Sequence, residues 1–347
     1  MKHIIKNIAY SMFCLAAVFF MASCDTDIES VDINEPGIEK QNTELYTTYL
    51  ANLKGYKARD HKAIFAWFDN SAKNPASQGQ SIIAIPDSLD YLVLSSPINL
   101  NARELSEIAK IKEDKGTKTL YEISYFTIKN AYDAAKQAFE ENAENKGKAF
   151  TPDFNTYLVD TVQARLALCE QFGYDGIVMT FSAKTKIYMY EEEKSEAIAL
   201  ENDFLGIAKD WKNRHADKML VLAGKPQNVE DQSVLELASY IIIPCMDATN
   251  AGGVTYNMNK ALVEGVPTAK LIPLVSLYSL DNTDTKTGYW GNTYAALGAA
   301  RFVASEHSSY KMAGLALDNI GNDYYHANFV YPVVRKAISI VNPTVKK

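Results

Sequence analysis

Residues 174–182 form the stretch that most constrains how this chain can fold. The stretch is a short apolar run that begins Tyr-Asp-Gly and ends in Ser182. A helical pattern over residues 157–172 precedes it, and Gly173 is the expected C-cap of that helix. A short apolar run between turn residues is typical of a strand buried on both faces of a parallel sheet. The alternative interpretation is an ordinary buried strand after an Asp-Gly turn, without a functional role.

Strand and helix patterns alternate along the rest of the chain. Eight strands are expected at 63–68, 91–96, 118–125, 174–182, 219–224, 240–247, 271–278 and 314–321. Helices are expected at 44–56, 102–112, 131–142 and 153–172, from the 191–193 glutamate run to residue 215, and at 293–305 and 331–341. Such an alternation favours a parallel sheet, and 347 residues suit one barrel. We therefore predict an α/β fold, a single-domain (β/α)8 TIM barrel over residues 41–347.

The 174–182 stretch resembles the fourth strand of family 18 glycoside hydrolases, the chitinases and endo-β-N-acetylglucosaminidases. Their pattern is Asp-Gly-x-Asp-x-Asp-x-Glu, and Asp175 and Gly176 match its first two positions. The next two acidic positions hold Val178 and Thr180, and Ser182 stands at the position of the catalytic glutamate. The resemblance thus implies the family's scaffold with a degenerate motif.

The resemblance also implies which chemistry the chain lacks. Family 18 enzymes use the N-acetyl group of the substrate as nucleophile, with a glutamic acid as proton donor and a nearby aspartate that orients the acetamido group. Alternate residues of a strand share one side, so positions 178, 180 and 182 are expected to face the barrel mouth. Valine, threonine and serine cannot act there as general acids near neutral pH. We therefore expect no catalytic residues in this motif.

Five residues are expected to bind a glycan ligand. Asp175 is the retained acid of the motif, and Trp67 lies near the carboxyl end of the first strand, where barrel enzymes place their sites. Asp247 follows strand six, Trp290 lies in the polar 281–291 loop with no evident core to pack against, and Asn319 lies on strand eight. Two alternatives stay open: Trp67 closes the barrel core, and Asp247 caps a turn.

Three other features bear on the site. The third strand ends Ser-Tyr-Phe at 124–126, without the glycines that many family members have there, which implies an altered pocket floor. Strand eight resembles the endoglycosidase pattern Gly-x-x-x-Tyr-Asn-Leu, with Asp318 in place of the tyrosine. The run Glu191, Glu192 and Glu193 could replace the missing acid. A solvated first helical turn is favoured instead, because the helix dipole attracts acidic residues there.

The first 40 residues carry targeting signals. Two lysines and an apolar run over residues 8–22 are typical of a secretory signal peptide over 1–23. The sequence Met-Ala-Ser-Cys at 21–24 resembles a bacterial lipobox with Cys24 as the lipidated residue; a plain signal peptide is the alternative. The acidic tether at 24–40 resembles a surface-export signal, or is only a solvated linker. We expect an outer-membrane lipoprotein that is exposed on the cell surface.

Composition excludes several other classes of function. The net charge of −7 argues against nucleic-acid binding, which needs clustered Lys and Arg. Cys169 and Cys245 are expected to be buried thiols and not a disulfide. No Cys or His spacing indicates a metal, so neither a metal nor a cofactor is expected.

Three functions remain as hypotheses. The first is a catalytically inactive barrel that binds glycans containing N-acetylglucosamine, in N-glycans or chitin-like polymers. The alternative is an active endo-β-N-acetylglucosaminidase or chitinase with relocated acids. The third is an assembly lipoprotein without a ligand of its own, which works with outer-membrane glycan-uptake proteins.

Overall fold

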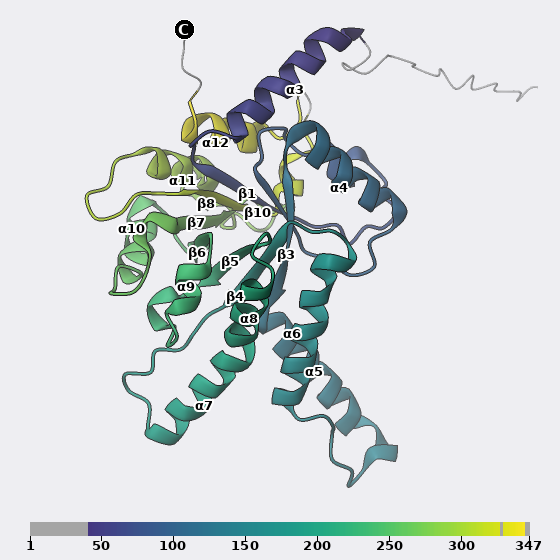
Figure 1. Cartoon of the computed structure of the whole chain (residues 1–347), viewed down its shortest axis with the longest axis vertical. Helices are drawn as coiled ribbons and strands as arrows, with labels where there is room; N and C mark the ends of the chain where they lie inside the picture. The colour runs from purple at the N-terminus through teal and green to yellow at the C-terminus, as the bar shows by residue number, and fades with distance from the viewer. Residues whose placement is uncertain (1–40, 327–328, 344–347) are drawn as a thin grey trace, which may run out of the picture. The chain divides into compact units, whose positions relative to one another are not determined.

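Eight parallel strands close into a barrel in the computed structural model, which describes residues 41–326 and 329–343 (Figure 1). The chain divides into two units, residues 1–48 and 49–347, and the barrel belongs to the second. The strands are β1 (Ala63–Phe68), β2 (Tyr91–Leu94), β3 (Lys118–Ser124), β4 (Gly176–Phe181), β5 (Met219–Gly224), β6 (Tyr240–Pro244), β7 (Leu271–Ser276) and β10 (Gly314–Asp318). Each pairs in parallel with the next, and β10 pairs with β1. The predicted (β/α)8 TIM barrel is confirmed.

Helices connect the strands and cover the outside of the barrel. They are α4 (Ala102–Lys115), α5 (Tyr125–Glu141), α6 (Phe154–Gln171), α7 (Glu191–Glu201), α8 (Ile207–Arg214), α9 (Ser233–Leu237), α10 (Ala251–Lys260) and α11 (Ala295–Ala304), and α12 (Pro332–Val341) follows the last strand. Helix α3 (Thr43–Lys57) precedes β1. A π-helical turn, Asn202–Gly206, joins α7 to α8, so the expected helix to residue 215 is one long helical segment. A short antiparallel pair, β8 (Tyr289–Trp290) and β9 (Thr293–Tyr294), precedes α11.

Six of the eight expected strands, β2, β3, β4, β6, β7 and β10, end earlier than the apolar pattern suggested, and for β3 and β10 a local backbone conformation gives the reason. Strand three was expected to reach residue 125, but the Ser124 hydroxyl accepts a hydrogen bond from the Thr127 amide at 3.3 Å and caps α5. Strand eight was expected to reach residue 321, but Asn319 has φ +56°, in the left-handed region, which stops the extended conformation after Asp318. In both places a local backbone interaction overrides the apolar pattern.

The core has two layers that follow from the alternation of side chains along each strand. The inner layer fills the barrel and contains Phe65, Trp67, Val93, Leu120, Val178, Val221, Ile242, Ile272, Leu274 and smaller residues. The outer layer lies between the strands and the helices and includes Ile177 and Met179 of β4. Gly176 opens β4 because a Cβ there would lie 2.2 Å from the Met219 carbonyl oxygen of β5. The glycine of the Asp-Gly pair is thus required by close strand packing.

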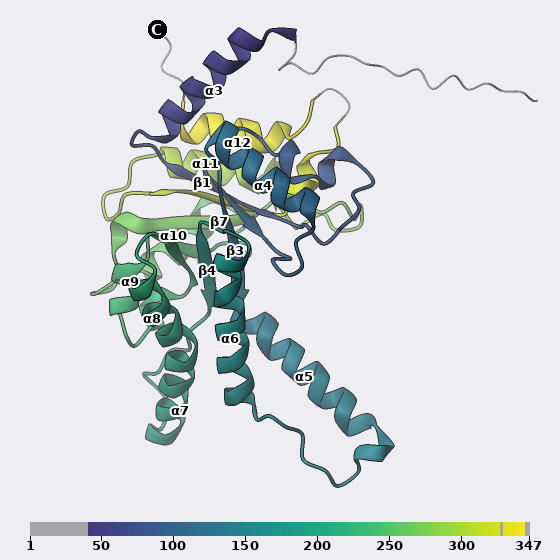
Figure 2. The ribbon, with the colours of Figure 1, turned by 45° about the vertical axis from the view of Figure 1, so that its right-hand side comes forward.

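Helix α5 departs from the usual barrel connection. It begins directly after β3 and runs away from the barrel, and α6 returns along it to the sheet (Figures 1 and 2). Helix α7 also extends beyond the carboxyl end of β4 (Figure 2). The carboxyl ends of β3 and β4 are therefore flanked by projecting helices.

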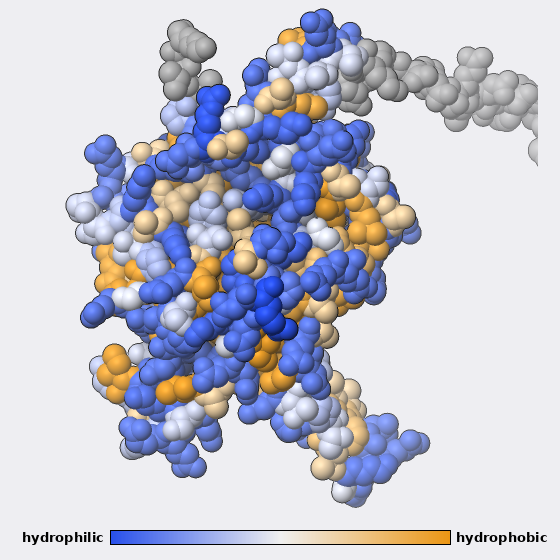
Figure 3. Space-filling model, viewed as in Figure 1, coloured by the Kyte–Doolittle hydropathy of each residue, from blue (hydrophilic) through white to orange (hydrophobic). Residues whose placement is uncertain are grey.

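The molecular face in Figure 3 is mostly hydrophilic, with smaller apolar patches among the polar residues. None of the helices within the described residues is long and apolar enough to cross a membrane.

Candidate functional site

The three motif positions of β4 lie at successive heights in the barrel. Val178 is completely buried in the inner layer of the core. Thr180, one step nearer the mouth, is half-buried, and its hydroxyl donates a hydrogen bond to Glu122 of β3. Ser182, just past the strand, is exposed and lines two cavities. The motif positions therefore run from the core to the mouth, and none of them carries an acid.

Glu122 of β3 is a carboxylate in direct contact with the motif position Thr180, and sequence analysis missed it. Its Oε1 accepts the Thr180 hydroxyl hydrogen bond, and its Oε2 accepts one from Trp67 Nε1 at 3.3 Å. We call Trp67, Glu122 and Thr180 the mouth cluster. Its three members come from β1, β3 and β4. The signal for Glu122 was present in the sequence as a single charged residue inside the apolar strand pattern Leu-Tyr-Glu-Ile.

Asp318 places a second carboxyl group at the carboxyl ends of the strands. It ends β10 and pairs in register with the buried Ser276 of β7. Burial raises the pKa of Asp318, and the charge of Glu122 raises it further, while hydrogen bonds from the Asn319 amide and the Ser276 hydroxyl partly oppose the shift. The protonated form of Asp318 is therefore favoured more than in an exposed aspartate.

The two tryptophans predicted to stack on a sugar are both packed into the protein. Trp67 is 5% exposed and belongs to the inner layer, as the core alternative stated. Its indole N–H contacts Glu122, and the rest of the ring is packed in the core. Trp290 packs against Gly298 of α11, where a Cβ would lie 2.2 Å from the indole ring. The expectation that Trp290 has no core to pack against is therefore wrong. Its Nε1 is buried and has no hydrogen-bond partner.

Asp175 lies at the other end of the barrel from the mouth. It directly precedes β4, and its carboxylate accepts a hydrogen bond from the Thr119 amide at 3.0 Å and pairs with Lys112 at 2.6 Å. These contacts join the amino ends of β3 and β4. The structure therefore places Asp175, predicted to bind the ligand, away from the other predicted residues, where it stabilises strand packing.

The remaining predicted residues lie on the mouth side, but apart from the mouth cluster. Asp247, after β6, is exposed and accepts a hydrogen bond from Asn257 Nδ2 at 3.3 Å. Asn319 is exposed, and its amide donates to Asp318 Oδ2 at 3.0 Å. The three glutamates at 191–193 form the exposed first turn of α7, as the solvated-face interpretation expected.

Three exposed aromatic rings that sequence analysis did not identify as site residues flank the mouth. Phe126 is 71% exposed at the start of α5, directly after β3. Tyr188 and Tyr190 are 90% and 86% exposed in the connection between β4 and α7. Aromatic rings that are this exposed on segments following neighbouring strands are available to stack on a flat apolar ligand face.

Two cavities meet at Ser182. One, of about 460 Å³, lies between the end of β4 and α7 and is lined by Tyr125, Phe181, Lys184, Met189, Glu193 and Glu196, among others. The other, of about 400 Å³, lies at the ends of β5 and β6 and is lined by Lys225, Gln227, Asn228, Pro244, Asn257 and Lys260, among others. Both volumes lie in the range of small-molecule sites, roughly 300–1,000 Å³. Their mixed linings of polar and apolar side chains suit a sugar.

The two cysteines that the structure describes are buried, as the sequence suggested. Cys169 and Cys245 are buried free thiols, and burial raises their pKa to about 11 and about 12. Among residues 41–326 and 329–343, no group of three or more His, Cys, Asp and Glu side chains is arranged to hold a metal ion. Cys24 lies outside the described residues.

A closed barrel of eight parallel strands with polar groups at the carboxyl ends is the architecture of TIM-barrel proteins that act on or bind small molecules and sugars. Residues 26–340 match glycoside hydrolase family 18, BT1044-like, and the chain belongs to that family. A comparison with curated proteins gave no match.

Several solved structures share this fold. BT1044 shares 17% identity with a TM-score of 0.59, covering 88% of this chain and 95% of BT1044. An endo-β-N-acetylglucosaminidase from Cordyceps militaris, in its apo form, shares 15% identity with a TM-score of 0.58, covering 85% of this chain and 96% of the fungal one. A mutant of the fungal enzyme, in complex with fucosyl-N-acetylglucosamine-Asn, has a TM-score of 0.57 at 15% identity, covering 85% and 95% of the two chains.

The raised pKa of Asp318 predicts a pH-dependent stability difference. The folded state binds this proton more tightly than the unfolded chain, so the wild type loses stability as pH rises from the ordinary aspartate pKa of ~3.9 through the higher folded value. We expect Asp318→Asn to raise the free energy of unfolding near neutral pH, and this gain to shrink toward pH ~3. Urea unfolding at several pH values measures the difference, with the exposed Asp247→Asn as control. A gain that stays constant with pH would contradict the prediction.

Proposed function

We propose that this chain is a cell-surface lipoprotein whose family 18 barrel binds N-acetylglucosamine-containing glycans without hydrolysing them. One observation carries the proposal: the three family acid positions hold Val178, Thr180 and Ser182. Val178 is packed into the core, and the Thr180 hydroxyl is already engaged by Glu122. A substrate-assisted mechanism needs a proton donor and an acetamido-orienting acid at these positions. Without them, the barrel keeps a concave mouth but lacks the family's chemistry.

Binding has support from the surfaces around the mouth. Phe126, Tyr188 and Tyr190 offer exposed rings, and the two cavities at Ser182 offer space and polar groups. Asp247 and Asn319 are exposed polar side chains that follow β6 and β10. The fungal relative of the same fold has been solved with an N-acetylglucosamine-containing ligand. We infer a ligand of that class here.

The location and partners of the protein are part of the same proposal. Lipidation at Cys24 would hold the barrel at the outer membrane, where glycan-uptake proteins are the expected partners. The absence of a membrane-spanning helix among the described residues is compatible with anchoring by lipid alone.

A second candidate function rests on the two carboxyl groups of the mouth. Glu122 accepts hydrogen bonds from Thr180 and Trp67, and burial favours the protonated form of Asp318. A pair of carboxyl groups at one site, one of them with a raised pKa, is the usual equipment of glycosidases. In this alternative, the barrel is an active endo-β-N-acetylglucosaminidase or chitinase whose acids have moved from β4 to β3 and β10.

The first prediction of this proposal concerns the exposed rings. Stacking that buries about 40–60 Å² of apolar surface at ~25 cal/mol per Å² gives about 1–1.5 kcal/mol, or roughly tenfold in Kd. We expect Tyr188→Ala and Tyr190→Ala each to weaken binding of chitin oligosaccharides or N-glycans by up to that factor. Calorimetry on residues 25–347 measures it, and the control is Tyr49→Ala in α3, which precedes β1. Glycan binding that both variants retain in full would place the site elsewhere, and no heat with any glycan would favour an assembly role.

The second prediction separates the binding protein from the hydrolase. A positioned general acid contributes ~10²–10⁴-fold to the rate. We therefore expect no cleavage of chitin oligosaccharides or N-glycans above background, as followed by mass spectrometry of the products. Cleavage that disappears in Glu122→Gln and in Asp318→Asn would establish the second candidate. Cleavage that instead disappears when Glu191, Glu192 and Glu193 are changed to Gln would assign the acid to α7.

The third prediction concerns the anchor. Cys24→Ser should abolish acylation and release the protein from the membrane fraction, because the lipid is the proposed attachment. Metabolic labelling with an alkyne fatty acid and fractionation of the cells test both effects. Cys14→Ser, in the expected signal peptide, is the matched control and should leave labelling unchanged. Equal labelling of wild type and Cys24→Ser would rule out lipidation at this residue.

A further inference from the structure

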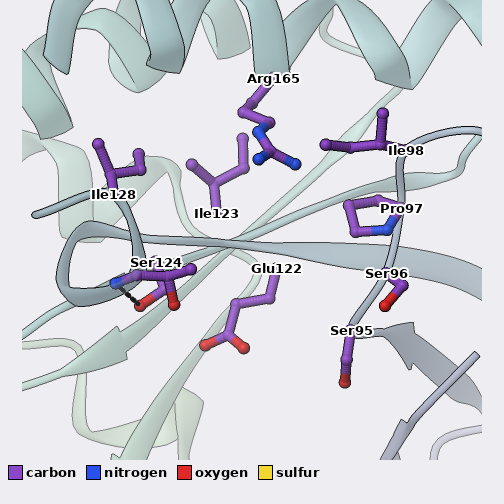
Figure 4. A pocket seen from close by; sticks show the side chains of 10 residues that line it. Ser95, Ser96, Pro97, Ile98, Glu122, Ile123, Ser124, Ile128 and Arg165 are labelled. Atoms are coloured by element: carbon purple, nitrogen blue, oxygen red, sulfur yellow. Dashed lines mark hydrogen bonds between the residues drawn. The ribbon is translucent and has the colours of Figure 1, made fainter. Parts of the chain in front are cut away.

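A third cavity lies beside the mouth, at the carboxyl ends of β2 and β3. Its volume is about 270 Å³, near the lower end of ligand sites, which suits a single sugar residue more than an oligosaccharide. Hydroxyl groups from Ser95, Ser96, Ser124 and Thr127 line it, together with the Arg165 side chain (Figure 4). The cavity also includes Glu122 of the mouth cluster, so it adjoins the site described above.

Arg165 is the charged group that faces this cavity. It comes from α6, and Figure 4 shows its guanidinium extending toward the centre of the space between Ile98 and Ile123. Within the described part of the chain, the guanidinium has neither a salt bridge nor a hydrogen bond. Burial lowers the pKa of Arg165, yet an arginine stays charged at neutral pH. A half-buried cation is thus held without a counter-ion.

The surroundings hold Arg165 in this position. The Tyr121 hydroxyl donates a hydrogen bond to the Arg165 carbonyl oxygen at 2.6 Å and fixes this turn of α6 against β3. Ile98, Ile123 and Ile128 provide apolar walls. The carboxyl group of Glu122 points away from Arg165 in Figure 4 and is engaged by Thr180 and Trp67. The protein's own acid in this cavity is therefore already occupied.

We propose that Arg165 and the neighbouring serine hydroxyls bind the carboxylate of an acidic sugar carried by the glycan. The inference rests on the proposed glycan-binding function and names a substrate class for it. A guanidinium donates two parallel hydrogen bonds to a carboxylate, and serine hydroxyls can donate further hydrogen bonds to the same carboxylate oxygens. A single carboxylate suits the cavity better than a polyanion, because Glu122 lies in its wall and the chain has a net charge of −7. The acidic sugar could be a sialic acid or a uronic acid.

The test compares acidic and neutral ligands on residues 25–347, which leave out the expected signal peptide and the proposed lipidation site Cys24. The first arm titrates N-acetylneuraminate, glucuronate and neutral N-acetylglucosamine as free monosaccharides by NMR. The second arm uses calorimetry with one complex N-glycan before and after enzymatic removal of its sialic acids. The variants are Arg165→Gln, which removes the charge, and Arg165→Lys, which keeps the charge but cannot donate two parallel hydrogen bonds. The exposed Arg301→Gln of α11 is the matched control.

We expect at least one acidic monosaccharide to bind the wild type saturably. Its affinity for Arg165→Gln should be about tenfold weaker or worse, because charge-assisted hydrogen bonds are lost. Arg165→Lys should fall between the two, and Arg301→Gln should match the wild type. The sugar that binds identifies the source of the carboxylate. Equal binding of acidic and neutral sugars, or equal binding by wild type and Arg165→Gln, would overturn the inference, as would no binding of either acid.

The two arms also separate this inference from the proposed function. If the desialylated glycan binds and Arg165→Gln binds the sialylated glycan equally well, the barrel binds glycans but Arg165 holds no acidic sugar. If free acidic sugars bind through Arg165 while no glycan produces heat, the acid site exists and the glycan-binding proposal fails.

Discussion

The packing of the closed barrel decides which positions of the chain can carry chemistry. Inward-facing side chains fill the interior in layers, so only the last layer before the mouth can hold polar groups that are both positioned and accessible. In β4, Val178 belongs to the filled interior, Thr180 to the last layer, and Ser182 to the open surface beyond it. The polarity of the degenerate motif thus follows the depth of its positions: the apolar residue is the most buried, and the hydroxyl-bearing residues lie nearest to solvent. An acid at position 178 would have to be accommodated inside the core that Val178 now completes.

The threonine of the motif and the glutamate of β3 form one physical arrangement. The Thr180 hydroxyl donates a hydrogen bond to Glu122, which also accepts one from the Trp67 indole. An aspartate at position 180, as in the family pattern, would bring a second carboxyl group against Glu122. Two carboxyl groups in contact cannot both ionise without a large energetic penalty, so one would have to hold a proton. A threonine at position 180 avoids this penalty, because its hydroxyl is a neutral hydrogen-bond donor to Glu122.

The sequence predicted the barrel because apolar runs and helical periodicity are properties of local segments. All eight strands could be found this way, but the ends of β3 and β10 depend on the Ser124 cap and the left-handed Asn319, which apolar patterns do not report. The site was harder, because lateral contacts decide it. Trp290 meets Gly298, and Asp175 meets Lys112, across elements whose packing cannot be read from spacing. Glu122 was visible as a lone charge in an apolar strand, whereas its partners Thr180 and Trp67 required the closed sheet.

The alternation along β3 also separates two chemically different surfaces. Glu122 faces the barrel interior with Thr180 and Trp67, while the next residue, Ile123, belongs to the outer layer beside Arg165 of α6. One strand thus holds an acidic group on its inner side and a cationic group near its outer side, with an isoleucine between them. The two charges do not pair: Glu122 is engaged by Thr180 and Trp67, and Arg165 stays available to a ligand. A glycan that lies over the end of β3 would place neutral rings at the mouth and a carboxylate at Arg165, where the Glu122 carboxyl group points away from the guanidinium.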